Sequence, residues 1–306
     1  MPLSPSLDYS PISLFILLFF SSKSLASDPR QPGTRRFCRY FSLAWLVVAS
    51  FTVTPASARD TTAHWDLGIG IGGLSIPHYR GSDQRQDYVA PIPYVRYEGK
   101  RLKIDREGGR FYLYKGDNVQ LDLSTSIAFP VDSHDDRARQ GMPDLHPVFE
   151  LGPRAQYVLY TNPAGNLQWR LALPVRLAIA TNIRHTRSIG LVFSPYLQLR
   201  YLRQWDTAVS AGPIFASETY HDYYYQVDPQ YATATRPAYD AKGGYSGIRL
   251  TLSASRRFRR RYWLGLFLRY DRFDGAIFAD SPLVKQNHSF MAGLAFAWIL
   301  SQGERR

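Results

Sequence analysis

Two things are scarce in this chain, cysteine and long apolar runs. Cys38 is the one cysteine among 306 residues, so the chain cannot form an internal disulfide. Although 45% of the residues are apolar, no run reaches 18 consecutive apolar positions, which excludes a transmembrane helix. A membrane-spanning form of this chain would therefore have to cross with strands.

Acidic residues are also in the minority, with 25 Asp and Glu against 37 Lys and Arg, a net charge of +12. A basic balance is typical of nucleic-acid-binding proteins when the charge gathers on one face. Most arginines here are scattered along the chain, so we expect no nucleic-acid partner. The exception is a compact basic run from Arg256 to Arg261.

Residues 1–58 have the features of a leader that ends in a cleavable signal peptide. The apolar run from Phe41 to Val53 follows three arginines and is closed by Pro55-Ala-Ser-Ala58, a pattern that signal peptidase recognises. We expect cleavage after Ala58, and residues 1–34 would then be an over-predicted start or a dispensable leader. Residues 59–306 contain no cysteine and carry 32 basic and 23 acidic side chains, a net charge of +9, which fits folding in the periplasm without disulfides.

The last fifth of the chain contains three stripes in which every second residue is apolar. The stripes are Ile248, Leu250, Leu252 and Ala254; Tyr262, Leu264, Leu266, Leu268 and Tyr270; and Phe290, Ala292, Leu294, Phe296, Trp298 and Leu300. A period of two places each set on one face of a strand. Strands of this length, apolar on one face and rich in aromatics, are typical of transmembrane β-barrels.

Similar strand-like segments recur at intervals of roughly 20 residues through the rest of the chain. They are Trp65 to Ile76, Tyr88 to Tyr97, Arg101 to Asp105, Arg110 to Tyr114, Val119 to Phe129, Phe149 to Tyr160, Leu167 to Ala180, Ile189 to Tyr201, Thr207 to Phe215 and Tyr220 to Val227. A soluble sandwich also alternates, but it seldom has Arg at mid-strand on a packed face, whereas a wet barrel interior accepts it.

The sequence therefore predicts an all-β protein over residues 59–306, an antiparallel transmembrane β-barrel of about 10–12 strands. We expect a monomer in the outer membrane, in contact with its lipid. Trp298 is expected to end the last strand, which leaves Ser301 to Arg306 outside the barrel.

Two long polar loops are expected, Pro130 to Pro147 and Asp228 to Gly244. Because outer-membrane barrels keep short turns in the periplasm and long loops outside, the second loop should face outward and the basic turn should face the periplasm. The turn's charge could meet anionic headgroups or an acidic partner, and the plainer alternative is a solvated turn. Its arginines are Arg256, Arg257, Arg259, Arg260 and Arg261.

The first long loop is the densest polar segment of the chain. Asp132, His134, Asp135, Asp136 and Asp144 could collect a hard cation such as calcium, but their spacing matches no defined metal loop. Arg137 and Arg139 lie among these acids, which favours a charged network that orders the loop. We expect no metal and no cofactor. No Gly-x-Ser-x-Gly motif and no recognisable Ser/His/Asp set occurs, so we expect no catalytic residues.

The stretch Pro130 to Pro147, followed by Glu150-Leu-Gly-Pro153, resembles the hallmark segment of the MipA/OmpV family of outer-membrane proteins. The segments Pro77 to Asp83 and Pro91 to Val95 are similar to the early motifs of that family, and the glycines of Gly212-Pro213 and Gly243-Gly244-Tyr245 fall where it has similar ones. The resemblance spans nearly all of residues 59–306. The residues of the hallmark segment, whose role the family leaves unassigned, are Asp132, Asp135, Asp136, Arg137, Arg139, Asp144 and Glu150.

The resemblance implies a scaffold that links murein-degrading and murein-synthesising enzymes in peptidoglycan biosynthesis, a non-enzymatic role. Its implied partners are a lytic transglycosylase and a bifunctional penicillin-binding protein. Other members of the family are discussed as osmotic-response or adhesive proteins.

The alternative is an outer-membrane pore or osmotic-response channel with an arginine-lined, anion-favouring lumen. The arginines expected to line it are Arg154, Arg170, Arg176, Arg200, Arg249 and Arg269. Salt bridges to acids such as Asp122 and Glu150 would instead plug that lumen, and a barrel of this size can be closed by its own side chains. A barrel enzyme acting on lipid or peptide is the least favoured interpretation.

Overall fold

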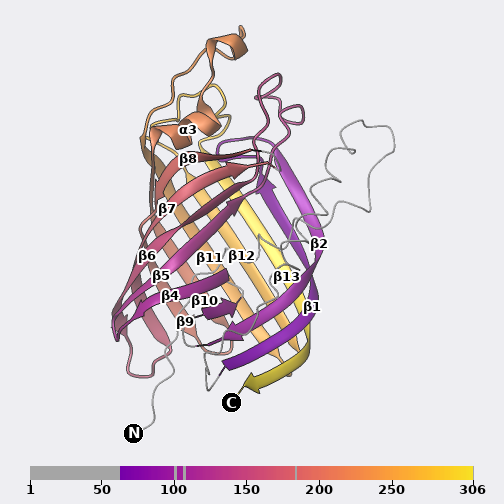
Figure 1. The fold of residues 1–306 in the computed structure, drawn as a ribbon, viewed down its shortest axis with the longest axis vertical. Coiled ribbons are helices and arrows are strands. Elements are labelled where there is room, and N and C mark those ends of the chain that lie inside the picture. Colours follow the sequence, from indigo (N-terminus) through magenta and orange to yellow (C-terminus); the bar gives the residue numbers. More distant parts are fainter. Residues whose placement is uncertain (1–62, 100–101, 106–107, 183–184, 306) are drawn as a thin grey trace.

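The computed structural model describes residues 63–99, 102–105, 108–182 and 185–305, which form a closed antiparallel β-barrel (Figure 1). The strands are β1 (Ala63–Pro77), β2 (Arg85–Glu98), β3 (Leu102–Asp105), β4 (Gly108–Lys115), β5 (Val119–Ala128), β6 (Val148–Thr161), β7 (Leu167–Thr181), β8 (Thr186–Phe193), β9 (Tyr196–Leu202), β10 (Asp206–Ala216), β11 (Gly244–Phe258), β12 (Tyr262–Arg272) and β13 (His288–Arg305). Helix α3 (Glu218–Tyr225) and the short 3-10 helix η2 (Pro229–Tyr231) lie between β10 and β11. The predicted leader and signal peptide lie outside the described residues.

Strands β8 and β9 share one position in the wall, because both pair with β7 on one side and with β10 on the other. The barrel therefore has 12 strand positions, which confirms the predicted all-β antiparallel barrel of about 10–12 strands. The segment from Ile189 to Tyr201 was expected to be one strand. It is broken at Ser194-Pro195, since proline has no N–H to donate to a ladder.

The first and last strands close the barrel. The ladder between β1 and β13 runs from Ala63, opposite Arg305, to Ser75, opposite Ala292. The expectation that the last strand ends at Trp298 is wrong, because Ser301 pairs with Leu67 and the ladder continues beyond it. Backbone pairing does not require apolar side chains, so the polar end of the strand still extends the sheet.

The alternating stripes face the outside of the barrel, as the period of two predicts. Phe296, Trp298 and Leu300 are 43–56% exposed, whereas Ala297 and Ile299 between them are buried. The same alternation holds on β11, where Ile248 and Leu250 are exposed. An apolar outer surface on a closed barrel is the arrangement that lipid requires, because pairing between neighbouring strands satisfies backbone polar groups within the wall.

Exposed aromatic side chains gather towards both ends of the wall. Those near the short turns are Tyr114, Tyr160, Trp169, Tyr201, Tyr262 and Trp298, and those near the long loops are Phe149, Phe193, Phe215, Tyr270 and Phe290. Rings at these two levels match the aromatic girdles that mark the two membrane interfaces.

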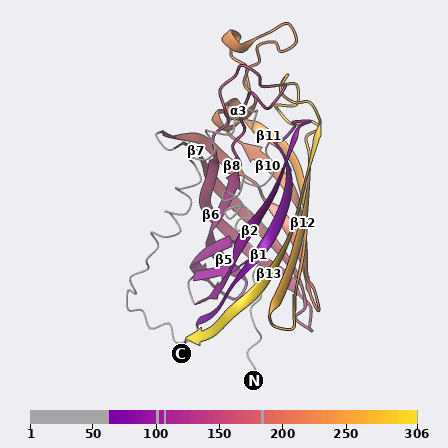
Figure 2. The same cartoon turned by 90° about the vertical axis from the view of Figure 1, so that its right-hand side faces the viewer.

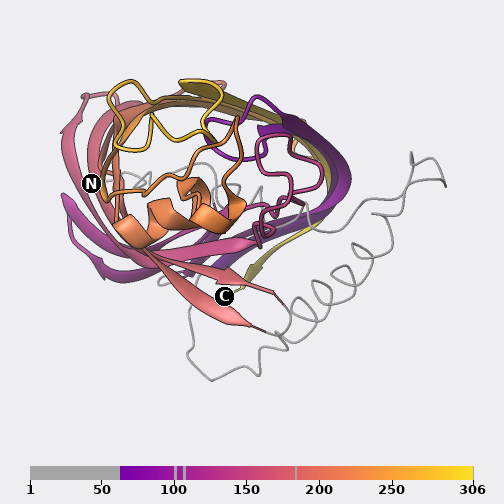
Figure 3. The same ribbon diagram turned by 90° about the horizontal axis from the view of Figure 1, so that it is seen from above.

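The two ends of the barrel differ in the length of their connections (Figures 1 and 2). One end carries the short turns, the start of β1 and the end of β13. We assign this end to the periplasm. The other end carries four segments that we call the extracellular cap: 78–84, 129–147, 217–243 and 273–287. Seen from above, α3 lies across the mouth of the barrel, inside the ring of strands (Figure 3).

Helix α3 corrects the expectation of a strand from Tyr220 to Val227. His221, Tyr224 and Tyr225 are its buried residues, at spacings of three and four that only a helix places on one face. Alternation is absent from this tyrosine-rich stretch, and the spacing of its buried side chains identifies the helix in hindsight. No helix among the described residues is long and apolar enough to cross a bilayer.

Candidate functional site: the extracellular cap, the lumen and the periplasmic rim

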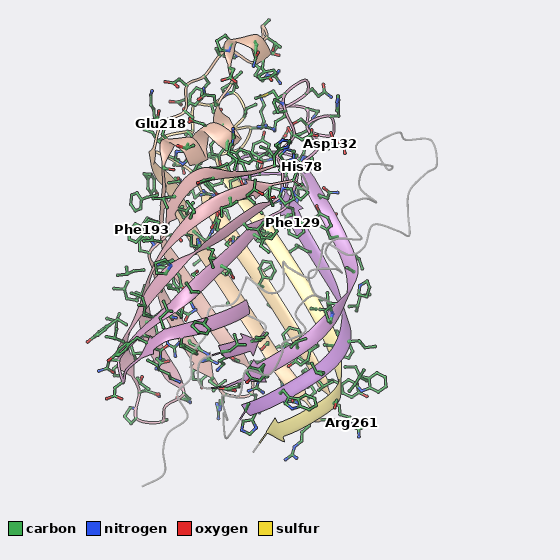
Figure 4. The ribbon with its side chains drawn as sticks, viewed as in Figure 1. His78, Phe129, Asp132, Phe193, Glu218 and Arg261 are labelled. Carbon is green, nitrogen blue, oxygen red and sulfur yellow. The ribbon has the colours of Figure 1, made fainter. Side chains whose placement is uncertain are left out.

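The buried carboxylate of Asp136 is the hub of the extracellular cap. His78 donates to it from Nδ1 over 2.9 Å, and the Ser82 hydroxyl donates over 3.0 Å. The backbone N–H of Ala138 donates to its other oxygen, also over 3.0 Å. Burial alone would raise the pKa of Asp136, but these hydrogen bonds favour its charged form and hold the pKa below its ordinary value. The hub joins the loop after β1 to the loop after β5 (Figure 4).

Other motif residues tie the same two loops together at the surface. Gln84 accepts a hydrogen bond from the Arg137 backbone N–H over 2.7 Å, and it donates to the carbonyl of Asp135, also over 2.7 Å. Arg137 also pairs with Asp83 at 3.0 Å. The loop is thus ordered by polar contacts, but Arg137 pairs with Asp83 of the other loop and not, as the sequence analysis expected, with the acids of its own loop.

The remaining cap residues of the motif hold the loop in shape. Asp144 accepts from the Ser133 N–H over 2.9 Å, and Asp132 accepts from the His134 N–H over the same distance. Buried Arg139 donates to the carbonyl of Tyr224 over 3.2 Å and so fastens the loop to α3.

Helix α3 is fastened in turn by His221, which is fully buried. Its Nδ1 lies against the carbonyl of Lys242 and therefore donates a proton, and its Nε2 accepts from the Ser246 hydroxyl at 2.6 Å. Burial lowers the pKa of His221, with the Arg80 charge acting in the same direction. Tyr225 stacks on Phe278 with ring centroids 3.8 Å apart.

No group of three or more His, Cys, Asp or Glu side chains in the described ranges is arranged to hold a metal ion. Asp132, Asp136 and Asp144 instead accept hydrogen bonds from backbone N–H groups of the loop, and Asp136 also accepts from His78 and Ser82.

The arginines expected in the lumen lie on the inward face of the barrel, and four of the six pair with carboxylates. The pairs are Arg154 with Asp122 at 2.9 Å, Arg176 with Glu150 at 2.9 Å, Arg200 with Asp206 at 2.7 Å and Arg249 with Asp271 at 2.7 Å. Glu150, which the sequence analysis placed both with the loop motif and among the acids that could plug the lumen, lies in the lumen and pairs with Arg176. Arg170 donates to Gln168 over 2.8 Å. Arg269 touches the sulfur of Met291 at 3.5 Å and has no carboxylate partner among the described residues.

At the opposite end lies the turn between β11 and β12, where Figure 4 labels Arg261. Arg259 and Arg260 adopt positive φ angles of 46° and 60°. The carbonyl of Arg260 accepts hydrogen bonds from Arg257 over 3.0 Å and from Gln302 over 2.8 Å, so the backbone of the turn is fixed. The side chains of Arg259, Arg260 and Arg261 are exposed.

Two flanking arginines of this turn lie against the barrel. Arg257 pairs with Asp66 at 3.1 Å, and Arg256 lies over the ring of Phe258 at 4.8 Å from its centroid. Beside the turn is a cavity of about 480 Å³, lined by Arg259, Arg260, Arg261, Trp298, Ile299, Leu300 and Gln302. The polar end of β13 therefore forms part of this rim.

A family model described as "MltA-interacting protein MipA" matches residues 69–300, which is most of the chain. The chain belongs to the MipA family. It is 24% identical to the MltA-interacting protein of Escherichia coli (strain K12) over 250 residues, covering 80% of this chain and 94% of the relative, and it matches that of Shigella flexneri equally.

Among solved structures, the chain resembles a bacterial polysaccharide outer membrane secretin at 10% identity, with a TM-score of 0.40 over 79% of this chain and 99% of the other. It also resembles the outer membrane protease OmpT of Escherichia coli at 8% identity, with a TM-score of 0.27 over 80% of this chain and 96% of the other.

The structure explains why glycine occupies position 212, in the Gly212-Pro213 motif. A Cβ added to Gly212 would lie 1.9 Å from the carbonyl oxygen of Pro195, where the chain breaks between β8 and β9. Only glycine permits β10 to approach the break so closely. Like the Asp136 hub, this glycine maintains the shape of the barrel.

Proposed function

We propose that this outer-membrane barrel is a non-catalytic scaffold whose periplasmic rim binds a lytic transglycosylase. A bifunctional penicillin-binding protein is the second proposed partner, so that murein cleavage and synthesis are held at one place. The relatives that match 80% of this chain, over 94% of their own length, carry the name MltA-interacting protein, which supports the first partner.

The observation that carries the proposal is the backbone of the basic turn. Arg259 and Arg260 are the central residues of a β-turn, which the Arg261 N–H closes by donating to the carbonyl of Phe258. Turns with positive φ at both central positions strongly favour Asn-Gly, because other side chains are strained there. Arg259 and Arg260 occupy these positions instead, at a cost of about 1 kcal/mol or more each. Strain of this kind is retained where the side chains have a use, and three adjacent exposed guanidinium groups suit an acidic partner surface.

The neighbouring cavity adds an apolar element to the same surface. Trp298 and Leu300, which lie on the outer face of the wall near the periplasmic interface, lie beside the arginines at its wall. A pocket next to a charged rim can take an anchoring side chain of the partner, while the arginines steer the encounter and fix its register.

The lumen supports a scaffold over the alternative of a pore. Four of the six expected arginines are held in ion pairs, and α3 lies across the mouth of the barrel (Figure 3). A lumen filled by paired side chains and closed by a loop helix offers no wide aqueous path.

The experiment replaces the two strained arginines by the residues that the turn prefers, Arg259→Asn with Arg260→Gly. This double variant removes both charges while relieving backbone strain, so the barrel should fold as well as the wild type. Binding of a purified lytic transglycosylase to the barrel in lipid nanodiscs should weaken by about tenfold or more.

The matched control is Lys115→Gln with Arg203→Gln, which makes the same change in net charge near other strand ends on the periplasmic side. It should bind as the wild type does. Equal weakening by both double variants would show that binding depends on net charge and not on this turn. Unchanged binding by the Asn-Gly variant would show that the turn does not contact the partner.

A further inference from the structure

A small cavity lies where the extracellular cap meets the inside of the barrel wall. Its volume is about 110 Å³. Its lining comes from helix α3, from the loop after β1, and from the strands β1, β5, β6, β7, β8, β10, β11, β12 and β13. Helix α3 lies across the mouth of the barrel above it (Figure 3). A ligand in this cavity would therefore contact both the cap and the wall.

Positive charge exceeds negative charge among the side chains that line this cavity. Four guanidinium groups face two carboxylates, and the six groups belong to Arg80, Arg176, Arg249, Arg269, Glu150 and Asp271. Glu150 pairs with Arg176 at 2.9 Å. Asp271 pairs with Arg80 at 3.0 Å and with Arg249 at 2.7 Å. Because two carboxylates neutralise only two of the guanidinium groups, the lining carries an excess of two positive charges.

Two hydrogen-bond donors of the lining lack an acceptor in the part of the chain that the structure describes. They are the Nε of Arg269 and the hydroxyl of Tyr224, and both atoms are buried. A second nitrogen of Arg269 lies 3.5 Å from the sulfur of Met291, which is a weak acceptor. A buried guanidinium without a counter-ion is unfavourable, and so is a buried hydroxyl without a partner. A ligand that accepts hydrogen bonds would satisfy both donors.

Two neighbouring arginines direct their donors to the protein instead. Arg249 donates twice to the carboxylate of Asp271, over 2.8 and 2.7 Å. Arg80 donates to the same carboxylate over 3.0 Å and to the carbonyl of Ser246 over 2.6 Å. These two arginines add charge to the cavity, whereas Arg269 is the arginine available to contact a ligand directly.

We propose that this cavity binds a small free oxyanion, a dianion such as phosphate or sulfate, which accepts hydrogen bonds from Arg269 and Tyr224. A dianion matches the excess of two positive charges, and charge-assisted hydrogen bonds to its oxygens are strong. The space corresponds to about three or four water molecules, which is enough for one oxyanion and too small for a lipid.

The bound ion ties the extracellular cap to the barrel, because Arg269 belongs to β12 and Tyr224 belongs to α3. The site lies at the opposite end of the barrel from the basic turn. It is therefore independent of the scaffold proposed for the periplasmic rim, and either proposal can fail without the other.

The test is calorimetric titration of inorganic phosphate into the folded barrel in nanodiscs of zwitterionic lipid, at pH 7.5 and constant ionic strength. The wild type should show one saturable site. Arg269→Met keeps the apolar stem beside Met291 and removes the guanidinium group, so it should weaken the affinity by about tenfold or more. Tyr224→Phe removes only the hydroxyl and should weaken it by about tenfold.

Arg256→Gln is the matched control, since Arg256 lines a different cavity near the periplasmic end. It removes the same charge as Arg269→Met, and its affinity for phosphate should equal that of the wild type.

Thermal unfolding separates an anion site from a purely structural role of Arg269. Without phosphate, Arg269→Met should unfold at a higher temperature than the wild type, because an unpaired buried charge has been removed. Saturating phosphate should raise the unfolding temperature of the wild type, since a ligand of the folded state stabilises it, and should leave that of Arg269→Met unchanged. A variant that unfolds at a lower temperature than the wild type without phosphate would contradict the proposal.

Saturable binding that both cavity variants weaken supports the proposal. The absence of saturable binding, equal affinities in Arg269→Met and Arg256→Gln, or an unchanged affinity in Tyr224→Phe would overturn it. Chloride binding as tightly as phosphate would also overturn it, because the cavity would then hold any counter-ion. Dimethyl phosphate mimics the diester of a phospholipid headgroup, and equally tight binding of this monoanion would assign the site to lipid. Heat-modifiable migration confirms that each variant is folded, and Tyr224→Phe carries the comparison if Arg269→Met is not.

Discussion

A single carboxylate joins loops that lie more than fifty residues apart in the sequence. Asp136 accepts from His78 and Ser82 in one loop and from the Ala138 N–H in its own. Its position in the family motif is explained by the two loops that it holds together. The effects of changing it should therefore be confined to the order and stability of the extracellular cap.

Asp136→Asn removes the charge and places the amide NH₂ group of asparagine, a hydrogen-bond donor, against groups that also donate. We expect a loss of about 1–3 kcal/mol in the free energy of unfolding, because buried hydrogen bonds to a charged group are lost. Limited proteolysis should cut the loop 130–147 faster, while partner binding at the periplasmic rim stays unchanged. Asp132→Asn is the control, since exposed Asp132 makes only a local contact. Equal protease resistance of Asp136→Asn and the wild type would contradict the role of the hub.

The cap should also weaken in acid. The pKa of His221 and that of Asp136 are both lower in the folded protein than their ordinary values of 6.5 and 3.8. A lowered folded-state pKa gives stability that is present above the unfolded-state pKa and is lost as the pH falls through the folded-state pKa. The free energy of unfolding should therefore be level above about pH 7.5, fall from about pH 6.5 through His221, and fall again below about pH 4 through Asp136.

The contribution of His221 is isolated by His221→Gln, which should flatten the first fall in denaturant titrations at pH 7.5 and pH 5. His185→Gln, in the exposed turn before β8, should leave the profile of the wild type. A His221→Gln profile identical to that of the wild type would assign the acid sensitivity to other groups.

At the level of elements, the pairing of β13 with β1 decides whether the barrel closes. The last residues of β13 are polar, yet they continue the ladder to Arg305 and supply Gln302 to the basic turn. The end of the chain therefore serves both the closure of the sheet and the shape of the periplasmic rim.

Deletion of residues 301–306 should weaken closure, at about 1 kcal/mol for each backbone hydrogen bond lost with β1. The unheated, compact form on a denaturing gel should then convert to the unfolded form at a lower temperature than the wild type. Ser301→Thr, which keeps the ladder, should behave as the wild type does. Unchanged conversion in the deletion variant would show that the polar end contributes nothing to the barrel.

Most strands of this barrel could be predicted because lipid on one side imposes a strict period of two. Ile248 and Trp298 were assigned to the outer face on that basis, and both are exposed. Helix α3 was not predicted, because the helical spacing of its buried tyrosines extends over only eight residues. The polar end of β13 was not predicted to be a strand, because backbone pairing does not require an alternation of apolar side chains.

The candidate sites were predictable in kind but not in arrangement. The arginines of the lumen follow from their inward phase, and Arg154 does pair with Asp122. The partners of Asp136 could not be inferred, because His78 lies 58 residues away and only the fold brings the two loops together. The positive φ of Arg259 could not be predicted, because nothing in the amino-acid composition indicates it.

At the level of the whole molecule, a closed cap and a paired lumen predict an electrically silent barrel. Planar-bilayer recording of the inserted protein should show no steady conductance, since four of the six lumen arginines are held by carboxylates and α3 covers the mouth. Heat-modifiable migration of the same sample confirms that the barrel is folded. A steady anion-selective conductance would favour the pore over the scaffold.

The most direct test of the scaffold is photo-crosslinking in intact cell envelopes. A photo-crosslinking amino acid replaces Arg260 at the tip of the periplasmic turn, or Gln140 in the extracellular cap as the control. The account predicts a crosslink to a lytic transglycosylase from position 260 and none from position 140. A transglycosylase crosslink from position 140, or its absence from position 260 in folded barrels, would contradict the central claim.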